Sequence, residues 1–282
     1  MTLVSGHKWL LDAKKRKYAI PQFNVLNLEM VDAVISAAEE TNSPVIVGVV
    51  DKHFPSLDVN SLVYAIKRKA NYSKNPIILH LDHGNSFKRI MEAIQLGFSS
   101  VMFDGSLLPI DENIYITKYV KECAKPLGIS VEAEIGHVGR GGDGNKVTSV
   151  EEAVKFAKET NVDYLAVSIG NTHGHMTTSN FNFDVLKNIC QSIDTPIVLH
   201  GGSDITGNNI DKLIDNGISK VNIFSDFANS YFQGVNEWGK NEEKDYLGLT
   251  HYGRNKSKEL VLEKLKLFKT IGKAEHGEFI NQ

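Results

Sequence analysis

Residues 77–85 read IILHLDHGN, an apolar segment that ends in charged and polar side chains. Pro76 precedes it, and the run of isoleucine and leucine is typical of a strand buried on both faces. The chain then turns to Asp82 and His83. A strand that finishes in a carboxylate and an imidazole places both at the edge of a parallel sheet, where such sheets hold their ligands. Taken alone, the segment fits a helix N-cap beside a hydrogen-bonded histidine equally well.

The same order of elements recurs along the chain. Short apolar strands are predicted at residues 19–25, 45–50, 77–81, 99–103, 129–134, 164–168, 196–200 and 220–223. Helices are predicted between them, and no two strands are joined by a hairpin signal, so the connections are crossovers and the sheet is parallel. Such a series predicts an α/β fold, a closed (β/α)8 TIM barrel. The GxGxxG pattern is missing after the first strand, which argues against a dinucleotide-binding fold.

The last part of the chain is predicted to extend beyond the barrel. Residues 239–253 are polar and indicate irregular structure, whereas residues 257–271 repeat apolar side chains at helical spacing. We expect a single domain over residues 1–282, with the barrel at about 1–238 and an extension at 239–282. The helix of this extension is expected to pack on the barrel or on a second subunit.

The composition is that of a soluble globular protein. Of 282 residues, 41% are hydrophobic and 23% are charged, and the net charge is −3, which gives no basic footprint for nucleic acid. Cys123 and Cys190 have no CxxC spacing and are predicted to be reduced, structural thiols. We expect no signal peptide, and no apolar run reaches about 18 residues. We therefore expect a cytoplasmic protein with no membrane or nucleic-acid partner.

Side chains suited to a metal ion collect at the ends of the predicted strands. They are Asp82 and His83 after the third strand, Glu132 and Glu134 on the fifth, His173 after the sixth and His200 at the end of the seventh. In a barrel these ends lie on one rim, the rim where active sites are built. Three imidazoles and a carboxylate on separate strands match a catalytic Zn²⁺ site, although Co²⁺ and Mn²⁺ accept the same ligands. For any one histidine, a hydrogen-bonded loop residue is the alternative.

Two segments at the ends of the seventh and eighth strands are candidates for binding a phosphate, and the first of them is rich in glycine. Residues 201–203 read GGS, and residues 222–225 read NIFS. These are the loops in which barrels commonly bind a phosphate through backbone N–H groups, and glycine permits the close approach. A phosphate site is therefore expected there, although glycine is also the usual residue of turns.

Together these segments resemble the class II, zinc-dependent ketose-bisphosphate aldolases of the fructose- and tagatose-bisphosphate type. The similarity runs in collinear order over about residues 1–235. Its most specific segments are HLDHG at 80–84, VEAEIG at 131–136, IGNTHG at 169–174 and VLHGGS at 198–203. The resemblance implies the barrel fold and a sugar-phosphate substrate.

The resemblance also implies a role for each matching residue. His83, His173 and His200 match the ligands of one zinc ion per subunit, and Glu134 matches the carboxylate that holds the ion in an alternate position. Asp82 matches the acid that moves the proton of the C4 hydroxyl group, while Zn²⁺ acts as a Lewis acid on the charge left on the ketone half. The segments that hold dihydroxyacetone phosphate, with a monovalent cation (Na⁺ or K⁺) nearby, match Asn24, Gly174, Gly201, Gly202, Ser203, Asn222, Ile223, Phe224 and Ser225.

The loop after the fifth strand departs from the family pattern. That loop usually carries GGxED, whose glutamate shuttles a proton at the enediolate carbon, whereas residues 139–144 here read GRGGDG. Gly142 takes the glutamate position, and the neighbouring Asp143 is the candidate substitute.

The aldehyde end departs as well. Phe224 replaces a small or polar residue, Asp204 replaces a glycine and Lys244 replaces an arginine. Phe224 supplies no side-chain donor for a second phosphate dianion, Asp204 would repel it, and Lys244 lacks the bidentate fork of arginine. We therefore expect the aldehyde partner to be neutral or less charged than glyceraldehyde 3-phosphate.

The sequence thus predicts a class II aldolase, an aldehyde-lyase. It is expected to cleave a ketose phosphate or bisphosphate, resembling fructose- or tagatose-1,6-bisphosphate, reversibly to dihydroxyacetone phosphate and an aldehyde. The alternative, suggested by Gly142, is a non-catalytic or regulatory sugar-phosphate-binding member of the family. A third interpretation, hydrolysis at zinc, is disfavoured by the LHGGS segment. The apolar stripe of the last helix and the resemblance imply a homodimer or homotetramer.

Overall fold

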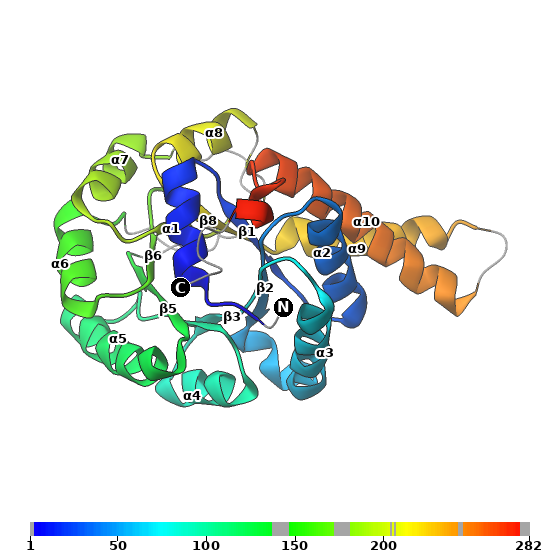
Figure 1. Cartoon of the computed structure of the whole chain (residues 1–282), viewed down its shortest axis with the longest axis horizontal. Helices are drawn as coiled ribbons and strands as arrows, with labels where there is room; N and C mark the ends of the chain where they lie inside the picture. Colours follow the sequence, from blue (N-terminus) through cyan, green and yellow to red (C-terminus); the bar gives the residue numbers. More distant parts are fainter. Residues whose placement is uncertain are drawn as a thin grey trace.

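The computed structural model describes residues 3–136, 147–171, 181–203, 205, 207–241 and 245–276. Its parallel strands pair in chain order, and β8 pairs with β1 to close a barrel (Figure 1). The predicted TIM barrel is confirmed. The strands are β1 (Ile20–Asn24), β2 (Val45–Val50), β3 (Ile77–Gly84), β4 (Ser100–Phe103), β5 (Ser130–Ile135), β6 (Tyr164–Val167), β7 (Ile197–Leu199) and β8 (Ile218–Ile223).

A helix follows each strand, and most of these helices form the outer ring (Figure 1). Several begin at a side chain that accepts a backbone N–H, as Asn27 and Ser149 do, which satisfies the first turn. The ring helices are α2 (Leu28–Glu40), α3 (Val59–Tyr72), α4 (Phe87–Leu96), α5 (Ile110–Ala124), α6 (Val150–Thr160), α7 (Phe183–Ser192) and α8 (Gly207–Asp215). Short 3-10 turns are η1 (Asp51–Ser56), η2 (Lys125–Leu127) and η3 (Lys273–His276).

The first helix, α1 (Gly6–Arg16), lies across the N-terminal opening of the barrel (Figure 1). Its Leu10 belongs to a buried cluster with Ile20, Ile46 and Ile78, which lie near the starts of β1, β2 and β3. An apolar layer therefore closes this end of the barrel.

Above the apolar layer, the interior of the barrel is polar. Alternate residues of a strand share one face, so each strand carries its inward residues two positions apart. These inward polar residues are buried, and they include Gln22 and Asn24 on β1, His80 and Asp82 on β3, Glu132 and Glu134 on β5, and Lys220 and Asn222 on β8. The arrangement concentrates charge toward the C-terminal end, where barrels build active sites.

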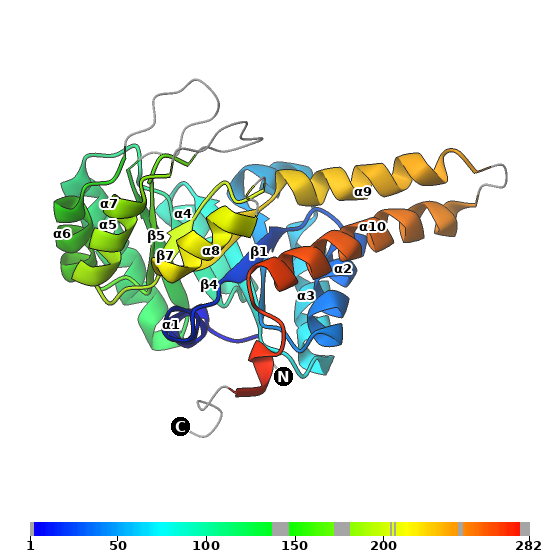
Figure 2. The same ribbon diagram turned by 90° about the horizontal axis from the view of Figure 1, so that it is seen from above.

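Two long helices form an arm that projects from the barrel (Figures 1 and 2). They are α9 (Ser225–Trp238) and α10 (Tyr246–Leu267), which pack against each other, while α10 also contacts α2. The expectation of irregular structure up to residue 253 was wrong, because α10 begins at Tyr246. Small residues explain the error: a Cβ on Gly253 would lie 2.6 Å from the Tyr231 ring, so close helix contact requires glycine in a stretch that looks like a loop. The boundary between barrel and extension stays a prediction.

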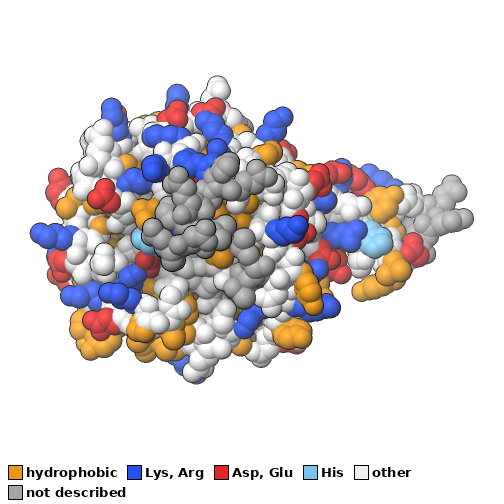
Figure 3. All heavy atoms as spheres, in the orientation of Figure 1, with side chains coloured by type: hydrophobic (Ala, Val, Ile, Leu, Met, Phe, Trp, Pro, Cys, Tyr) orange, Lys and Arg blue, Asp and Glu red, His pale blue; other side chains and the backbone are white. Residues whose placement is uncertain are grey.

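Charged side chains of both signs are interspersed over the face shown in Figure 3. Cys123 and Cys190 are both free thiols. Within the described part of the chain, no helix has the length and apolar character needed to span a membrane.

Candidate active site

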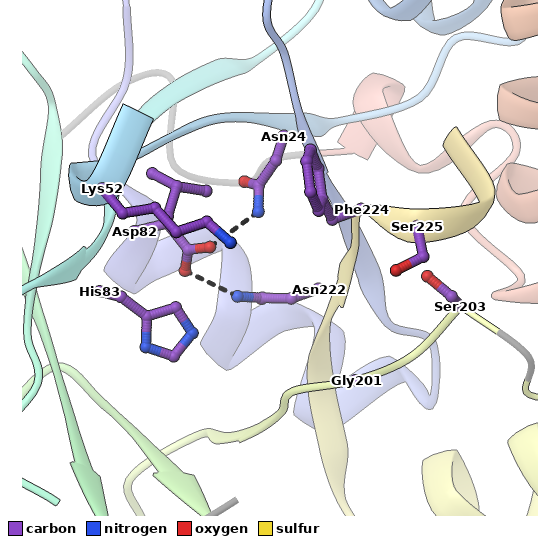
Figure 4. A pocket seen from close by; sticks show the side chains of 10 residues that line it. Asn24, Lys52, Asp82, His83, Gly201, Ser203, Asn222, Phe224 and Ser225 are labelled. Atoms are coloured by element: carbon purple, nitrogen blue, oxygen red, sulfur yellow. Dashed lines mark hydrogen bonds between the residues drawn. The ribbon is translucent and has the colours of Figure 1, made fainter. Parts of the chain in front are cut away.

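A cavity of about 260 Å³ opens at the C-terminal ends of the strands (Figure 4). Residues from β1, β2, β3, β7 and β8 and the segments that follow them contribute to its wall. They are Asn24, Val50, Lys52, Asp82, His83, Gly201, Ser203, Asn222, Phe224 and Ser225. All except Val50 and Lys52 were predicted as site residues from the sequence.

Asp82 is held at this cavity by two side-chain amides (Figure 4). Asn24 Nδ2 donates to Oδ2 at 2.8 Å, and Asn222 Nδ2 donates to Oδ1 at 2.9 Å. Gln22 Nε2 donates in turn to Asn24 Oδ1 at 2.9 Å, which fixes the orientation of the Asn24 amide. Each carboxylate oxygen of Asp82 is thus an acceptor with a defined direction.

The electrostatic surroundings keep Asp82 ionised. Burial alone would raise the pKa of Asp82, but positive charge at His83, His200 and Lys220 outweighs burial and lowers it. The carboxylate is therefore in its basic form at neutral pH, which is the form that accepts a proton from a hydroxyl group.

His83 follows Asp82 and adopts a left-handed backbone conformation with φ of 53°. This turn aims its ring at Asp104, whose Oδ2 lies 2.7 Å from Nδ1. The ring centroid of His83 lies 4.7 Å from that of His200, edge to face. A carboxylate on one ring nitrogen fixes the tautomer and leaves Nε2 available as a metal ligand.

His200 lies fully buried between two glutamates of β5. Its Nε2 lies 2.9 Å from Glu132 Oε1, and its Nδ1 lies 3.3 Å from Glu134 Oε2. Burial opposes a charge on the ring, but Glu134 and Glu132 outweigh burial and raise the pKa of His200 to about 10. The two carboxylates therefore favour a positive charge at this ring. Asn171 Nδ2 donates to the His200 carbonyl at 2.9 Å and steadies this end of β7.

The donor set fits a divalent metal ion. Two groups of side chains each place their ligand atoms within 4.8 Å of one another, namely Asp82, His83 and His200, and His83, Asp104 and Glu134. The buried Oε2 of Glu134 receives no hydrogen bond from the described residues. Imidazole and carboxylate ligands suit zinc, and a buried carboxylate oxygen facing two imidazoles is where a cation is most favourable.

Three predicted site residues lie outside the described residues. They are Asp143, His173 and Gly174. Asp204 and Lys244, two of the residues from which a neutral or less charged aldehyde was expected, also lie outside the described residues.

The predicted phosphate loops are tied to each other at the rim. Gly201 has a positive φ of 73°, and the Gly202 N–H donates to the Asn222 carbonyl at 2.9 Å. A Cβ on Gly202 would lie 2.1 Å from Cγ1 of Val221, so only glycine fits there. Gly202 therefore has a packing role beside the cavity.

Ser203 and Ile223 differ in how they are available to a substrate. The Ser203 carbonyl accepts from Lys264 Nζ at 2.6 Å, which joins this loop to α10. The Ile223 side chain is fully buried in the hydrophobic core. Only the backbone of Ile223 remains for the substrate contact that the sequence predicted.

A protein-family model described as "Fructose-bisphosphate aldolase class-II" matches residues 4–273. The chain belongs to this family. It is 38% identical over 289 residues to 6-phospho-5-dehydro-2-deoxy-D-gluconate aldolase of Halalkalibacterium halodurans, covering 97% of this chain and 99% of the relative. It is 34% identical over 285 residues to sulfofructosephosphate aldolase of Alkalicoccus urumqiensis, covering 97% and 99%. The crystal structure of the YdjI aldolase from Escherichia coli K12 superimposes with a TM-score of 0.89 at 37% identity, covering 97% and 100%.

As a class II aldolase the chain is a carbon–carbon lyase, and its family implies a sugar-phosphate substrate. Members of this family are typically zinc-dependent, which agrees with the imidazole and carboxylate cluster at the strand ends. The relatives act on different substrates, so the aldehyde half of the reaction is not fixed by membership.

Three residues at or beneath this candidate site were not predicted from the sequence. Asp104 directly follows β4, and Asp82 lies near the C-terminal end of β3. An acidic residue at a strand end was therefore the signal that could have predicted Asp104. Lys220 lies buried on β8 and contacts Glu132, and no local pattern predicts a lysine inside a barrel. Lys52 lies two residues after β2, and its Nζ is 5.7 Å from the centroid of the Phe224 ring.

Lys52 places a positive charge in the wall of the cavity. The adjacent Asp51 anchors η1 because Oδ1 accepts from Arg89 Nε at 2.7 Å and Oδ2 accepts from the Asn85 N–H at 3.0 Å. This anchor leaves Lys52 on the cavity side, near Asp82 and Phe224 (Figure 4). The cavity wall therefore holds a cationic side chain that the prediction about the aldehyde did not take into account.

Proposed function

We propose that this class II aldolase reversibly cleaves a ketose 1-phosphate to dihydroxyacetone phosphate and an aldehyde, with one Zn²⁺ ion per subunit. The observation that carries the proposal is Asp82, an ionised carboxylate fixed by Asn24 and Asn222 at the wall of the cavity. Its candidate ligand atom lies within 4.8 Å of those of His83 and His200. A base beside a cationic centre is the pair that carbon–carbon cleavage next to a ketone requires.

Each group has a proposed task. His83, His200 and Glu134, with His173 beyond the described ranges, would hold the ion, which supplies Lewis-acid stabilisation of the charge that develops on the ketone half. Asp82 removes the proton of the C4 hydroxyl so that the aldehyde forms. Asp143 is proposed to return a proton to the carbon of the ketone half.

The phosphate is proposed to lie at the loops after β7 and β8. Backbone N–H groups of Gly201, Ser203 and Ser225 are the donors proposed for it, since backbone donors in these barrel loops suit a phosphate. Asn24, Asn222 and Phe224 complete the proposed substrate wall, and a monovalent cation (Na⁺ or K⁺) is proposed nearby.

The aldehyde half is proposed to carry an anionic group that faces Lys52. If the phosphate lies over β7 and β8, the other end of the substrate points toward β2 and Lys52, with Asp82 between the two ends. The names of the relatives support this reading. One acts on a gluconate derivative and the other on a sulfofructose phosphate, so each substrate carries a second acidic group beside its phosphate.

Isotope exchange tests the proposal without requiring the aldehyde to be known. Purified protein with Zn²⁺ and dihydroxyacetone phosphate in D₂O should exchange a C3 proton, followed by NMR. Asp82→Asn should keep this exchange and its zinc, yet cleave a ketose phosphate about 10²- to 10⁴-fold more slowly. Asp143→Ala should lose the exchange, and it should also cleave more slowly, because the enediolate on the ketone half is no longer protonated. Binding of dihydroxyacetone phosphate with no exchange by the parent protein would favour the non-catalytic alternative.

The assembly is proposed to be a homodimer or homotetramer. The arm carries exposed hydrophobic side chains (Figure 3), among them Phe232, Tyr246 and Leu247 with exposed fractions of 68%, 78% and 65%. Exposed apolar residues of this size are unfavourable in water and commonly mark an interface. Sedimentation of a monomer at micromolar concentration would count against this assembly.

A further inference from the structure

A lysine lies inside the barrel beneath the aldolase site. Lys220 on β8 is fully buried. Its Nζ donates to Glu132 Oε2 at 2.7 Å and to Asn222 Oδ1 at 2.7 Å. Burying an ammonium group is costly unless it is paired, and a hydrophobic residue at that position is often no less stable. Packing alone does not explain why a lysine is here.

The two acceptors of Lys220 lead to different parts of the site. Glu132 uses its other oxygen, Oε1, to contact His200 Nε2 at 2.9 Å. Asn222 uses its amide nitrogen to donate to Asp82 Oδ1 at 2.9 Å. Lys220 therefore connects to the proposed metal ligand, His200, through Glu132, and to the proposed base, Asp82, through Asn222.

The donors and acceptors that these side chains carry fix the direction of both series of hydrogen bonds. Lysine only donates, so the Asn222 amide must present its oxygen to Lys220 and its NH₂ group to Asp82. An ionised glutamate only accepts, and the Glu132 carboxylate is paired with the Lys220 ammonium group, whose Nζ lies 2.7 Å from Oε2. His200 must then donate from Nε2, which leaves Nδ1 as the nitrogen facing Glu134 and the metal cluster.

Other neighbours of Glu132 do not set this direction. His80 Nε2 lies 3.5 Å from Glu132 Oε2, and its Nδ1 is 2.6 Å from the Ser100 hydroxyl. Burial lowers the pKa of His80 to about 3, so His80 is neutral and contributes no charge. Lys220, with Nζ 2.7 Å from Glu132 Oε2, is the cation that pairs with this carboxylate.

We propose that Lys220 is a positioning residue that sets, at once, the tautomer of His200 for metal binding and the orientation of Asn222 toward Asp82. This rests on the proposed function for the roles of His200 and Asp82. Lys220 itself touches neither the proposed substrate nor the ion, and the proposal assigns it a measurable effect on both halves of the site.

Zinc affinity of the apo-protein is the primary test, because it needs no substrate. Lys220→Met keeps the length and removes the charge, and its zinc affinity, measured by competition with a chromogenic chelator, should fall about 10- to 100-fold. Lys264→Met removes another buried lysine, one that contacts Ser203 and Asp226, and should bind zinc within about threefold of the parent. Circular dichroism and the melting temperature establish that each variant is folded.

A double variant separates positioning from charge balance. Glu132→Gln should also weaken zinc binding, because an amide can donate as well as accept and no longer enforces donation from His200 Nε2. If Lys220 only neutralised Glu132, the double variant Lys220→Met/Glu132→Gln would regain the affinity of the parent. The positioning role predicts that zinc binding stays weak.

The second readout is kcat at saturating zinc. Lys220→Met should lose at least about tenfold in cleavage even when loaded, because Asn222 is free to turn away from Asp82. The proposal would be overturned if Lys220→Met folds and has the zinc affinity and kcat of the parent. If Lys220→Met does not fold, the proposal would be overturned by a Glu132→Gln variant that binds zinc as tightly as the parent. Failure of the proposed function would appear differently, as a parent protein that binds zinc but neither exchanges nor cleaves.

Discussion

The amide of Asn24 on β1 reaches Asp82 on β3 at 2.8 Å because the strand between them, β2, carries no side chain at Gly48. A Cβ on Gly48 would lie 2.1 Å from Asn24 Oδ1 and 2.8 Å from Gln22 Nε2. The glycine therefore makes room for the chain of hydrogen bonds that orients the proposed base. This is a packing requirement inside the barrel with a direct consequence for the site.

Replacing this glycine should impair the proposed base and leave the metal in place. Gly48→Ala forces Asn24 away from Asp82, and loss of a hydrogen bond to a charged group costs about 1.5–3 kcal/mol, so kcat/KM should fall at least about tenfold. Zinc content should stay at the parental level. Gly239→Ala is the control, because its added Cβ would meet no atom closer than 3.4 Å. Parental activity in Gly48→Ala would show that Asn24 is not needed.

Asp104 should control metal affinity through His83. Its Oδ2 lies 2.7 Å from His83 Nδ1, and the histidine opposite it lowers the pKa of Asp104 despite burial. Asp104→Asn should weaken zinc binding about 10- to 100-fold, which is the usual effect of removing a carboxylate that hydrogen-bonds to a metal-binding histidine. Chelator competition measures the effect. Asp111→Asn, an exposed acid on α5 that pairs with Lys155, should leave zinc affinity unchanged; equal loss in both variants would contradict a specific role for Asp104.

Cys190 should react slowly and only at high pH. Burial raises the pKa of Cys190 to about 11, and the thiolate is the reactive form. In a Cys123→Ser variant, alkylation by iodoacetamide should therefore rise about tenfold for each pH unit from 7 to 10, as the thiolate fraction grows. Mass spectrometry follows the labelling. A rate that levels off near pH 9 would show a thiol with its ordinary pKa.

The strand ends were predictable because a barrel brings them to one rim whatever the details of packing. Asp82 and His83 needed only the end of one apolar strand, and His200 needed another. The rings of His83 and His200 lie with their centroids 4.7 Å apart because the strands close into a barrel. The predicted roles of these residues in catalysis stay predictions until the variants are measured.

Contacts across the barrel were not predictable in the same way. Lys220 meets Glu132 at 2.7 Å although 88 positions separate them. That contact depends on the stagger of the strands around the barrel, which local periodicity does not encode. Gly253 was misread for a related reason, since a glycine required by helix packing looks the same in sequence as a glycine in a turn.

Lys52 escaped prediction because its position depends on the path of η1 after β2. The Asp51 contacts with Arg89 and Asn85 turn this segment so that a lysine beyond the strand end lines the cavity. The expectation of a neutral or less charged aldehyde was drawn from Phe224, Asp204 and Lys244. It did not take Lys52 into account, which lines the cavity.

The preference for an anionic aldehyde should depend on this lysine. Lys52→Gln removes the charge and keeps a polar side chain of similar reach. Because Lys52 is solvent-exposed, its interaction is screened, and we expect kcat/KM for condensation of dihydroxyacetone phosphate with glyceraldehyde 3-phosphate to fall by only about tenfold. The value for unphosphorylated glyceraldehyde should change by less than about threefold, since no charge is then lost.

Two controls decide between this role and a general effect. Lys15→Gln, an exposed lysine on α1 at the opposite end of the barrel, makes the same change in net charge and should leave the ratio of the two kcat/KM values unchanged. Exchange of the C3 proton should also be unchanged in Lys52→Gln, because the ketone half lies away from β2 in the proposed pose. Raising the ionic strength should shrink the parental preference toward that of the variant. A ratio that is the same in Lys52→Gln and the parent would remove Lys52 from the aldehyde site and restore the expectation of a neutral aldehyde.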